Sequence, residues 1–469
     1  MNKKQYKRLI VMNALVVSQI LNAITGLAQS LVANNEKRLA VSTTVSPASP
    51  VMKYSDPQTG MTVDQAVAYA LEHNGELLAS RKEIDAANAI VKQAALRANP
   101  TLETSGAKTV TGTDNTLMVQ GTLPLELGGR RSARIAMAER ELEMRRQDVA
   151  NRERLLAGEV RAKFGEAIAA ILKLGFDQDL IDTSQHGYNL VAARVTEGST
   201  PPLEQNMVLV ELNRFRSMRE VAEGTTQLAM LGLRNVMGMN PDEQLRLNGD
   251  FKDLIRPMRP LAEATQQALA ARPDLKLAKA TESFAEARIE QARSEGRVDA
   301  SLSAGYQRMD SSFPLNGIND AGQLSPIRST FNYLTFGVSL NLPVRNKNQG
   351  AIEAAIAEAE AAKKRREFTE LTIKREVASA YAQYNSATRA AEIFRVGVQD
   401  QANANLEVVK RTYELGSKTL IDYLGEQRQF IELQNSYIDM LLNTYNARVE
   451  MERAVGSSPL SKPKEEGHD

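Results

Sequence analysis

Few residues in this chain have the types and spacing that catalysis or metal binding needs. The chain has no cysteine, which excludes disulfides, thiolate metal sites, cysteine nucleophiles and cysteine-linked lipid anchors. Its three histidines, His73, His186 and His468, have no paired cysteine or second histidine at a ligand spacing. No glycine-rich phosphate loop follows a strand. We therefore assign no catalytic residue, no cofactor and no metal site.

Methionine is another residue type here whose side chain can bind a metal. Five methionines gather loosely in the first half of the chain: Met207, Met218, Met230, Met237 and Met239. Thioethers suit Cu(I), but the spacings of 11, 12 and 7 residues between the first four are typical of residues that fill a helical core. We interpret them as packing residues.

Two carboxylates occupy matching positions in distant segments. RVTEGSTPPLE (194–204) and YELGSKTLIDYL (413–424) each place an acid six residues after a glycine, Glu204 after Gly198 and Asp422 after Gly416. If both segments are turns at one end of neighbouring helix pairs, a repeated ring of such acids concentrates negative potential and attracts cations. The alternative is that both acids are solvated surface charges beside a turn.

Long helices must hold these two segments. Residues 344–458 contain no proline over 115 positions, and proline costs roughly 3 kcal/mol inside a helix. We predict long helices there, broken only at Gly416. A coiled-coil seam of three- and four-residue spacings runs from Tyr384 to Leu415. As a helix, residues 345–415 would span on the order of 100 Å.

The chain is built from a duplication. The segment 61–100 recurs at 259–297 with an offset of 198 residues, and alternating segments after each copy predict β-hairpins at about 101–127 and 299–343. One face of the last strand carries Leu334, Phe336, Val338, Leu340 and Leu342, and the other carries Tyr333, Thr335, Gly337, Ser339 and Asn341. We expect the apolar face outside and the polar face inside.

These patterns predict a mainly α-helical protein with a small β part in two structural repeats. The first repeat covers residues 61–256 with a helical tip near 198, and the second covers 257–456 with a tip near 416. Outside the repeats we predict an extended linker over 29–60 and a flexible tail over 457–469.

The N-terminus resembles an export signal. Lys3, Lys4, Lys7 and Arg8 precede an apolar stretch, and small residues around Ala28 offer a cleavage site, which predicts a signal peptide over residues 1–28. The alternative is a membrane anchor, but Asn13, Gln19 and Asn22 make a weak permanent span.

Composition argues against a nucleic-acid partner. Lys+Arg 58 and Asp+Glu 57 leave a net charge of +1, and no basic cluster has interleaved aromatic residues. The aromatic content of 5% without tryptophan is too low for several large compact cores. An elongated helical protein fits better.

Four strands per chain cannot close a barrel, and open strand edges cannot sit in lipid. If the strands cross a membrane, the chain must therefore oligomerise. Three copies would supply twelve strands, which is an economical number for a pore.

The ordered duplication resembles the outer-membrane efflux channels of the TolC family over about residues 60–457. The motifs LELGGRRSARIAMA (125–138), LPVRNKNQGAI (342–352) and ALRANPTLE (95–103) resemble its CzcC-like branch, which serves heavy-metal efflux. The resemblance implies a homotrimer with a 12-stranded transmembrane β-barrel in outer-membrane lipid and a long periplasmic α-helical barrel. It implies a channel rather than an enzyme.

The resemblance also implies partners and site residues. The helical tips, Gly198, Ser199, Gly416 and Ser417, would dock to a periplasmic adaptor (membrane fusion) protein that connects to an inner-membrane RND-type pump. Glu204, Asp422, Tyr413 and Lys418 would form the links that hold the periplasmic aperture shut. Pro201-Pro202 at the first tip and Gly425, where a second acid is common, depart from the family pattern.

Three functions stay open from sequence. The favoured one is a passive exit duct for heavy-metal cations. The second is the same channel serving multidrug efflux or type I protein secretion. The third is a soluble periplasmic coiled-coil scaffold, and the alternating strands argue against it.

Overall fold

The computed structural model describes residues 50–251 and 259–456. The predicted signal peptide, the linker up to residue 49 and the tail over 457–469 lie outside the described residues. The chain divides into two units after Lys53. In the first unit the described part is a short 3-10 helix, η1 (Pro50–Lys53). The second unit begins at Tyr54.

Two similar series of elements follow one another along the second unit. The first series consists of α2 (Val63–His73), α3 (Gly75–Ala95), β1 (Thr101–Lys108), β2 (Asn115–Pro124), α4 (Arg130–Thr196) and α5 (Pro202–Met237). The second consists of α7 (Leu261–Ala271), α8 (Pro273–Glu295), β3 (Asp299–Ile318), β4 (Leu324–Asn341), α9 (Gln349–Phe394), η2 (Arg395–Gln399), α10 (Asp400–Glu414) and α11 (Leu420–Val455). The helices α2 and α7 have 11 residues each, and α5 and α11 have 36 each. The predicted duplication is therefore present in the fold.

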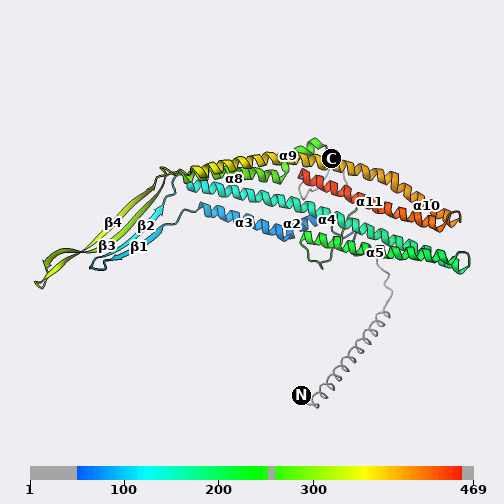
Figure 1. Ribbon diagram of the computed structural model, residues 1–469, viewed down its shortest axis with the longest axis horizontal. Helices are drawn as coiled ribbons and strands as arrows, with labels where there is room; N and C mark the ends of the chain where they lie inside the picture. The colour runs from blue at the N-terminus through cyan, green and yellow to red at the C-terminus, as the bar shows by residue number, and fades with distance from the viewer. Residues whose placement is uncertain (1–49, 252–258, 457–469) are drawn as a thin grey trace, which may run out of the picture. The chain divides into compact units, whose positions relative to one another are not determined.

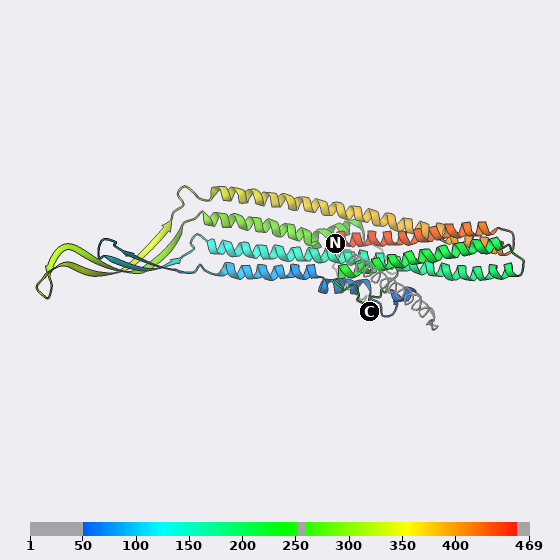
Figure 2. The same cartoon turned by 60° about the horizontal axis from the view of Figure 1, so that its bottom comes forward.

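The long helices of this unit lie side by side in one layer (Figure 1 and Figure 2). α4 packs against α3 and α5 and also against α8 and α11, and α9 packs against α8 and α11. The pair α3 and α5 therefore forms one edge of the layer, and α9 with α10 forms the other. The sheet lies at one end of the helices and the two helical turns lie at the opposite end.

The four strands form one antiparallel sheet in the order β1-β2-β3-β4. Leu302 of β3 lies opposite Leu123 of β2 and Val338 of β4, so the apolar positions of neighbouring strands share a face. That face is uncovered in the chain, since the side chain of Phe336 is 82% exposed. Within the described residues the outer sides of β1 and β4 have no strand partner.

One helix differs from the prediction. The sequence predicts helices broken only at Gly416, but α9 passes into the π-helix η2 at Arg395 before α10 begins. Gly397 lies inside η2, but an isolated glycine is also tolerated within an α-helix, so its presence did not distinguish the π segment from a continuous helix. A π segment inserts one extra residue into a helix.

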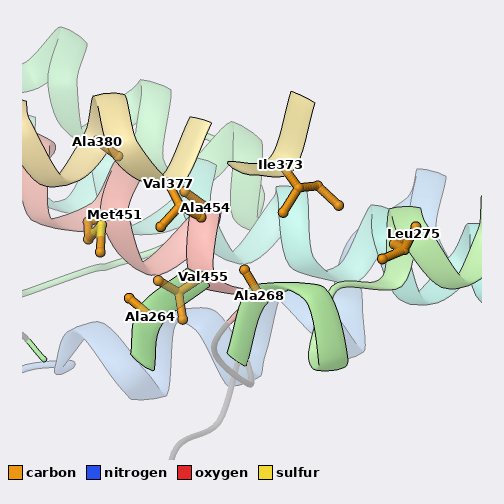
Figure 3. Close-up of a cluster of buried hydrophobic side chains, with 9 residues drawn as sticks. All are labelled: Ala264, Ala268, Leu275, Ile373, Val377, Ala380, Met451, Ala454 and Val455. Atoms are coloured by element: carbon orange, nitrogen blue, oxygen red, sulfur yellow. The ribbon is translucent and has the colours of Figure 1, made fainter. Parts of the chain in front are cut away.

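A buried hydrophobic cluster lies within the second repeat, where α7, α8, α9 and α11 meet. The short helix α7 packs on α9 and α11 through small and branched side chains (Figure 3). The buried residues of this cluster are Ala264, Ala268, Leu275, Ile373, Val377, Ala380, Met451, Ala454 and Val455. Alanine at many of these positions lets the helices approach closely, which fits the low aromatic content.

Residues 54–60 differ from the extended linker expected there. Tyr54 is buried, and both Ser55 and Met61 form isolated parallel bridges with Leu247. The backbone N–H of Leu247 donates to the carbonyl of Tyr54 at 2.8 Å. Pairing with a segment nearly 200 residues away orders this stretch, and no local pattern predicts such pairing.

Candidate functional site

The two helical tips have the same backbone geometry. Gly198 (φ 75°) and Gly416 (φ 76°) are left-handed and end α4 and α10. The N–H of Ser199 donates to the carbonyl of Arg194, and the N–H of Ser417 donates to that of Thr412, both at 2.9 Å. These six-to-one bonds satisfy the last carbonyls of each helix. A Cβ on either glycine would meet no atom within 4 Å, so the tips are uncovered in this chain.

Both tip acids stand at the third position of the helix that follows. Glu204 is in the first turn of α5 and Asp422 in the first turn of α11, where the helix dipole favours negative charge. At the second tip Thr419 and Asp422 form a capping box: the Asp422 carboxylate accepts from the N–H and the hydroxyl of Thr419 at 3.0 and 2.8 Å. These bonds hold the pKa of Asp422 below its usual value.

The first tip has no such cap. Pro201 precedes α5 and has no side-chain oxygen to bond the helix, so the Glu204 carboxylate has no capping partner. Instead it accepts a hydrogen bond of 3.3 Å from the Tyr413 hydroxyl at the second tip. Burial, followed by the nearby Glu204 charge, raises the pKa of Tyr413. The Tyr413 ring stacks on the Tyr423 ring, with 5.8 Å between the ring centroids and an interplanar angle of 7°.

The structure thus brings two of the four predicted gate residues into contact. Glu204 and Tyr413 form a link between the tips. Asp422 caps its own helix, and Lys418 acts on it electrostatically, further lowering its pKa. Among the described residues Lys418 makes no ion pair.

A second link joins the two helical hairpins, α4–α5 and α10–α11, and the sequence did not predict it. The Glu211 side chain of α5 is buried and accepts from Arg428 of α11 at 3.0 Å and from Arg214 at 3.2 Å. Between this link and the tips lies a cavity of about 80 Å³, whose lining includes Tyr413 and Tyr423. The spacing of these residues in the sequence gives no signal, because the partners are 217 positions apart.

The histidines and methionines that could bind a metal take part in helix hydrogen bonds or in packing. The Nδ1–H of His73 donates to the Tyr69 carbonyl at 3.0 Å, and that of His186 donates to the Asp182 carbonyl at 2.6 Å. His468 lies outside the described residues. Met230 and Met237 are fully buried, as the packing interpretation predicts. In residues 50–251 and 259–456 no three histidine or carboxylate side chains gather to hold a metal ion.

The glycine-arginine motif at the start of α4 builds the joint between sheet and helices. Gly128 is left-handed with a φ of 73°. Arg130 donates to the carbonyl of Glu295 at 3.0 Å, and Arg131 donates to the carbonyl of Ala95 at 2.9 and 2.6 Å. These guanidinium groups satisfy carbonyls at the ends of α8 and α3, where a helix favours positive charge.

The second motif builds the equivalent joint in the second repeat. Asn348 takes a left-handed conformation (φ 62°) immediately before α9, and its side-chain amide donates to the carbonyl of Ala292 at 2.8 Å. Both motifs therefore fix how the strands leave the helices. Neither contributes a ligand to the tips.

A model of the outer membrane efflux protein family matches residues 66–239 and 264–457, one match to each repeat. The chain belongs to the outer membrane efflux protein family. This membership places the protein in the outer membrane and decides against the soluble scaffold. No helix in the described part of the chain combines the length and apolar character needed to cross a membrane.

One known protein and several solved structures are similar to most of the chain. The cobalt-zinc-cadmium resistance protein CzcC of Cupriavidus metallidurans is 26% identical over 402 residues, covering 84% of this chain and 90% of CzcC. A solved structure of CusC has a TM-score of 0.70 at 17% identity and covers 89% of this chain and 100% of that one. The outer membrane protein VceC of Vibrio cholerae has a TM-score of 0.65 at 16% identity, covering 84% and 96%.

Proposed function

We propose that this protein is the outer-membrane exit duct of a tripartite efflux system and that it works as a homotrimer. The observation that carries this proposal is that the four-stranded sheet is open within one chain. The sheet has an uncovered apolar face and two unpaired edges, and in lipid every backbone polar group needs a partner. Pairing β4 of one copy with β1 of the next removes both edges, and three copies give a closed barrel of twelve strands.

The helical layer supports the same assembly. Each of its edges carries an exposed apolar stripe with a coiled-coil spacing. On α5 the stripe consists of Leu203, Val210, Val221 and Leu228, and on α9 to α10 it consists of Ile393, Val396, Val408 and Leu415. Leu203 and Leu415 both lie beside a tip, so the two stripes match in height when one edge meets the other edge of a neighbouring copy. Such a contact continues the sheet pairing into a helical tunnel.

We propose divalent heavy-metal cations as the cargo, delivered by an RND-type pump through a periplasmic adaptor that contacts Gly198, Ser199, Gly416 and Ser417. The identity to CzcC over 84% of the chain supports this cargo. A duct of this kind passes ions without making or breaking bonds, so it is not an enzyme.

The cargo is tested in a deletion strain and in the same strain carrying the gene again. Inhibitory concentrations of zinc, cobalt, cadmium and copper should fall on deletion and recover on complementation, whereas those of a dye panel should change little. A phenotype limited to dyes would replace metal cargo with multidrug efflux while leaving the duct in place.

We further propose that the aperture is held by links among Glu204, Tyr413, Asp422 and Lys418. The bond between Tyr413 and Glu204 supports the first of these links. A hydrogen bond of this kind contributes about 1 kcal/mol, and a trimer would repeat it three times. The exposed Asp422 and Lys418 add charge at the same end of the duct.

Single-channel conductance in planar bilayers tests the gate. Tyr413→Phe removes the donor hydroxyl and should raise conductance, and adding Lys418→Ser should raise it further. Tyr423→Phe is the matched control, because this ring stacks on Tyr413 but makes no bond to Glu204. If Tyr413→Phe, its combination with Lys418→Ser and the Tyr423→Phe control all had the same conductance, the gate assignment would be refuted. The combination Glu204→Gln with Asp422→Asn should lower cation selectivity.

A further inference from the structure

Cations gather where the strands meet the helices. In the four joints, residues 96–100, 123–134, 294–300 and 342–349, seven side chains are positive and three are negative. The positive residues are Arg97, Arg130, Arg131, Arg134, Arg297, Arg345 and Lys347, and the negative ones are Glu126, Glu295 and Asp299. The chain as a whole is nearly neutral, with a net charge of +1, so positive charge is concentrated at the joints.

The joints lie at one level of the molecule. Arg297 donates to the carbonyl of Gly128 at 3.0 Å, which connects the joint before β3 to the joint after β2. Arg134 donates to the carbonyl of Leu96 at 2.9 Å and thereby reaches the joint before β1. Asn348 reaches α8 through Ala292. Figure 1 shows all four strands leaving the helices in this region.

Three of these cations have no partner among the described residues. Carboxylates bind two of the other four: Asp299 accepts from Arg130 at 2.9 Å and Glu126 from Arg134 at 2.5 Å. Arg131 donates to the Ala95 carbonyl and Arg297 to the Gly128 carbonyl. Arg97, Arg345 and Lys347 are exposed and form no ion pair within residues 50–251 and 259–456. Their charges are therefore available to an external anion.

Exposed apolar side chains stand directly beside these cations. Leu342 is 58% and Val344 76% exposed, and Arg345 and Lys347 follow at once. On the other hairpin the exposed Leu127 precedes Arg130 and Arg131. An apolar surface that ends in long basic side chains is the pattern of a membrane boundary, where such side chains reach the headgroups.

We propose that Arg97, Arg345 and Lys347 form a basic belt that binds the phosphate headgroups of anionic phospholipids in the periplasmic leaflet of the outer membrane. The proposal rests on the proposed function, which puts the sheet in lipid and the helices in the periplasm. The belt lies at the helix side of the sheet, so the leaflet it meets is the periplasmic one. Lipopolysaccharide would meet the opposite, hairpin end of the sheet. By holding headgroups at three points per chain, the belt fixes how deeply the strands sit.

The test measures lipid selectivity of the purified trimer in phosphatidylcholine vesicles with spin-labelled lipids. A cation beside an anionic surface raises binding roughly fivefold, so the native protein should prefer phosphatidylglycerol over phosphatidylcholine by about that factor. The combined variant Arg97→Gln, Arg345→Gln and Lys347→Gln should lose this preference. High salt should also reduce the preference in the native protein, because it screens exposed charges.

The matched control removes three exposed cations from the helices: Lys276→Gln, Lys363→Gln and Lys374→Gln. It should keep the native preference. An unchanged preference in the belt variant, or an equal loss in the control, would overturn the belt. Unlabelled phosphatidylglycerol should compete with the spin-labelled lipid and abolish the preference. Lipopolysaccharide that competes equally well would overturn the assignment to the periplasmic leaflet.

Failure of the belt and failure of the duct are separable. Conductance in neutral phosphatidylcholine bilayers does not need anionic headgroups, so the belt variant should still form channels there. Absence of channels from the native protein would refute the proposed duct instead.

Discussion

Replacing Gly165 with alanine should destabilise the protein even though alanine is the better helix former. Gly165 lies within α4, and a Cβ at this position would overlap the ring carbons Cδ1 and Cε1 of Tyr445 on α11. The ring cannot easily withdraw. It is 3% exposed, its hydroxyl donates to the Arg161 carbonyl at 3.1 Å, and it packs against Phe251 at 5.7 Å.

The expected magnitude follows from three opposing effects. Overpacking a buried site costs typically 1–3 kcal/mol, and loss of the Tyr445 hydrogen bond adds about 1 kcal/mol. The helix propensity of alanine returns about 1 kcal/mol. We therefore expect a net loss of about 1–3 kcal/mol in the free energy of unfolding. The matched control is Gly224→Ala in α5, where a Cβ meets nothing within 4 Å, and it should stabilise by about 0.5–1 kcal/mol.

Thermal unfolding of the helical circular dichroism signal in detergent measures both variants. The midpoint should fall for Gly165→Ala and hold or rise for Gly224→Ala. In a Tyr445→Leu background the Gly165→Ala substitution should cost less, because the two sites are in contact and their effects are not additive. Equal midpoints for the two alanine variants would refute the packing argument.

Three further predictions concern the sheet, the buried arginine between α7 and α8, and pH. Phe336→Arg on the exposed apolar face should cost about 2–4 kcal/mol and lower the amount of heat-sensitive trimer in outer-membrane extracts, whereas Thr335→Arg on the opposite face should be tolerated; equal damage would mean that the facing is reversed. Arg272 is 2% exposed and bonds Glu376 at 2.7 Å, so Arg272→Ala should destabilise by about 3 kcal/mol and increase trypsin cleavage, and native-like resistance would contradict this. Burial raises the pKa of Asp177 to about 6, so the ionised carboxylate destabilises the folded state above pH 6 and the protonated carboxyl at low pH does not. Asp177→Asn should therefore raise the unfolding midpoint at pH 7.5 and leave it unchanged at pH 3.5. An equal gain at both pH values would rule out ionisation as the cause.

Features of the fold that depend on neighbouring residues follow from local sequence patterns. The absence of proline over 344–458 predicts long helices, and a glycine supplies the left-handed turn after α4 and again after α10. Period-two alternation predicts the strands and their apolar face. Each of these features depends on a few adjacent backbone conformations, which local composition controls. Repetition of the whole order at two places then indicated the family.

A local sequence signal also distinguishes the two helical tips. Thr419 and Asp422 have the spacing of a capping box, which indicates that Asp422 stabilises α11. The first tip has Pro201 at the equivalent place, and that difference leaves Glu204 available to Tyr413. The two acids occupy equivalent positions in the sequence, but they have different partners in the structure.

The contacts between distant side chains depend on how the helices pack. Tyr413 and Glu204 are 209 positions apart, and Arg428 and Glu211 are 217 apart. The close approach of Gly165 to Tyr445 likewise follows from how α4 and α11 pack. Many pairs of tyrosine, arginine and carboxylate would suit such bonds chemically, and the rotation of each helix about its axis selects among them. That rotation depends on the packing of the whole layer, so no local pattern encodes it.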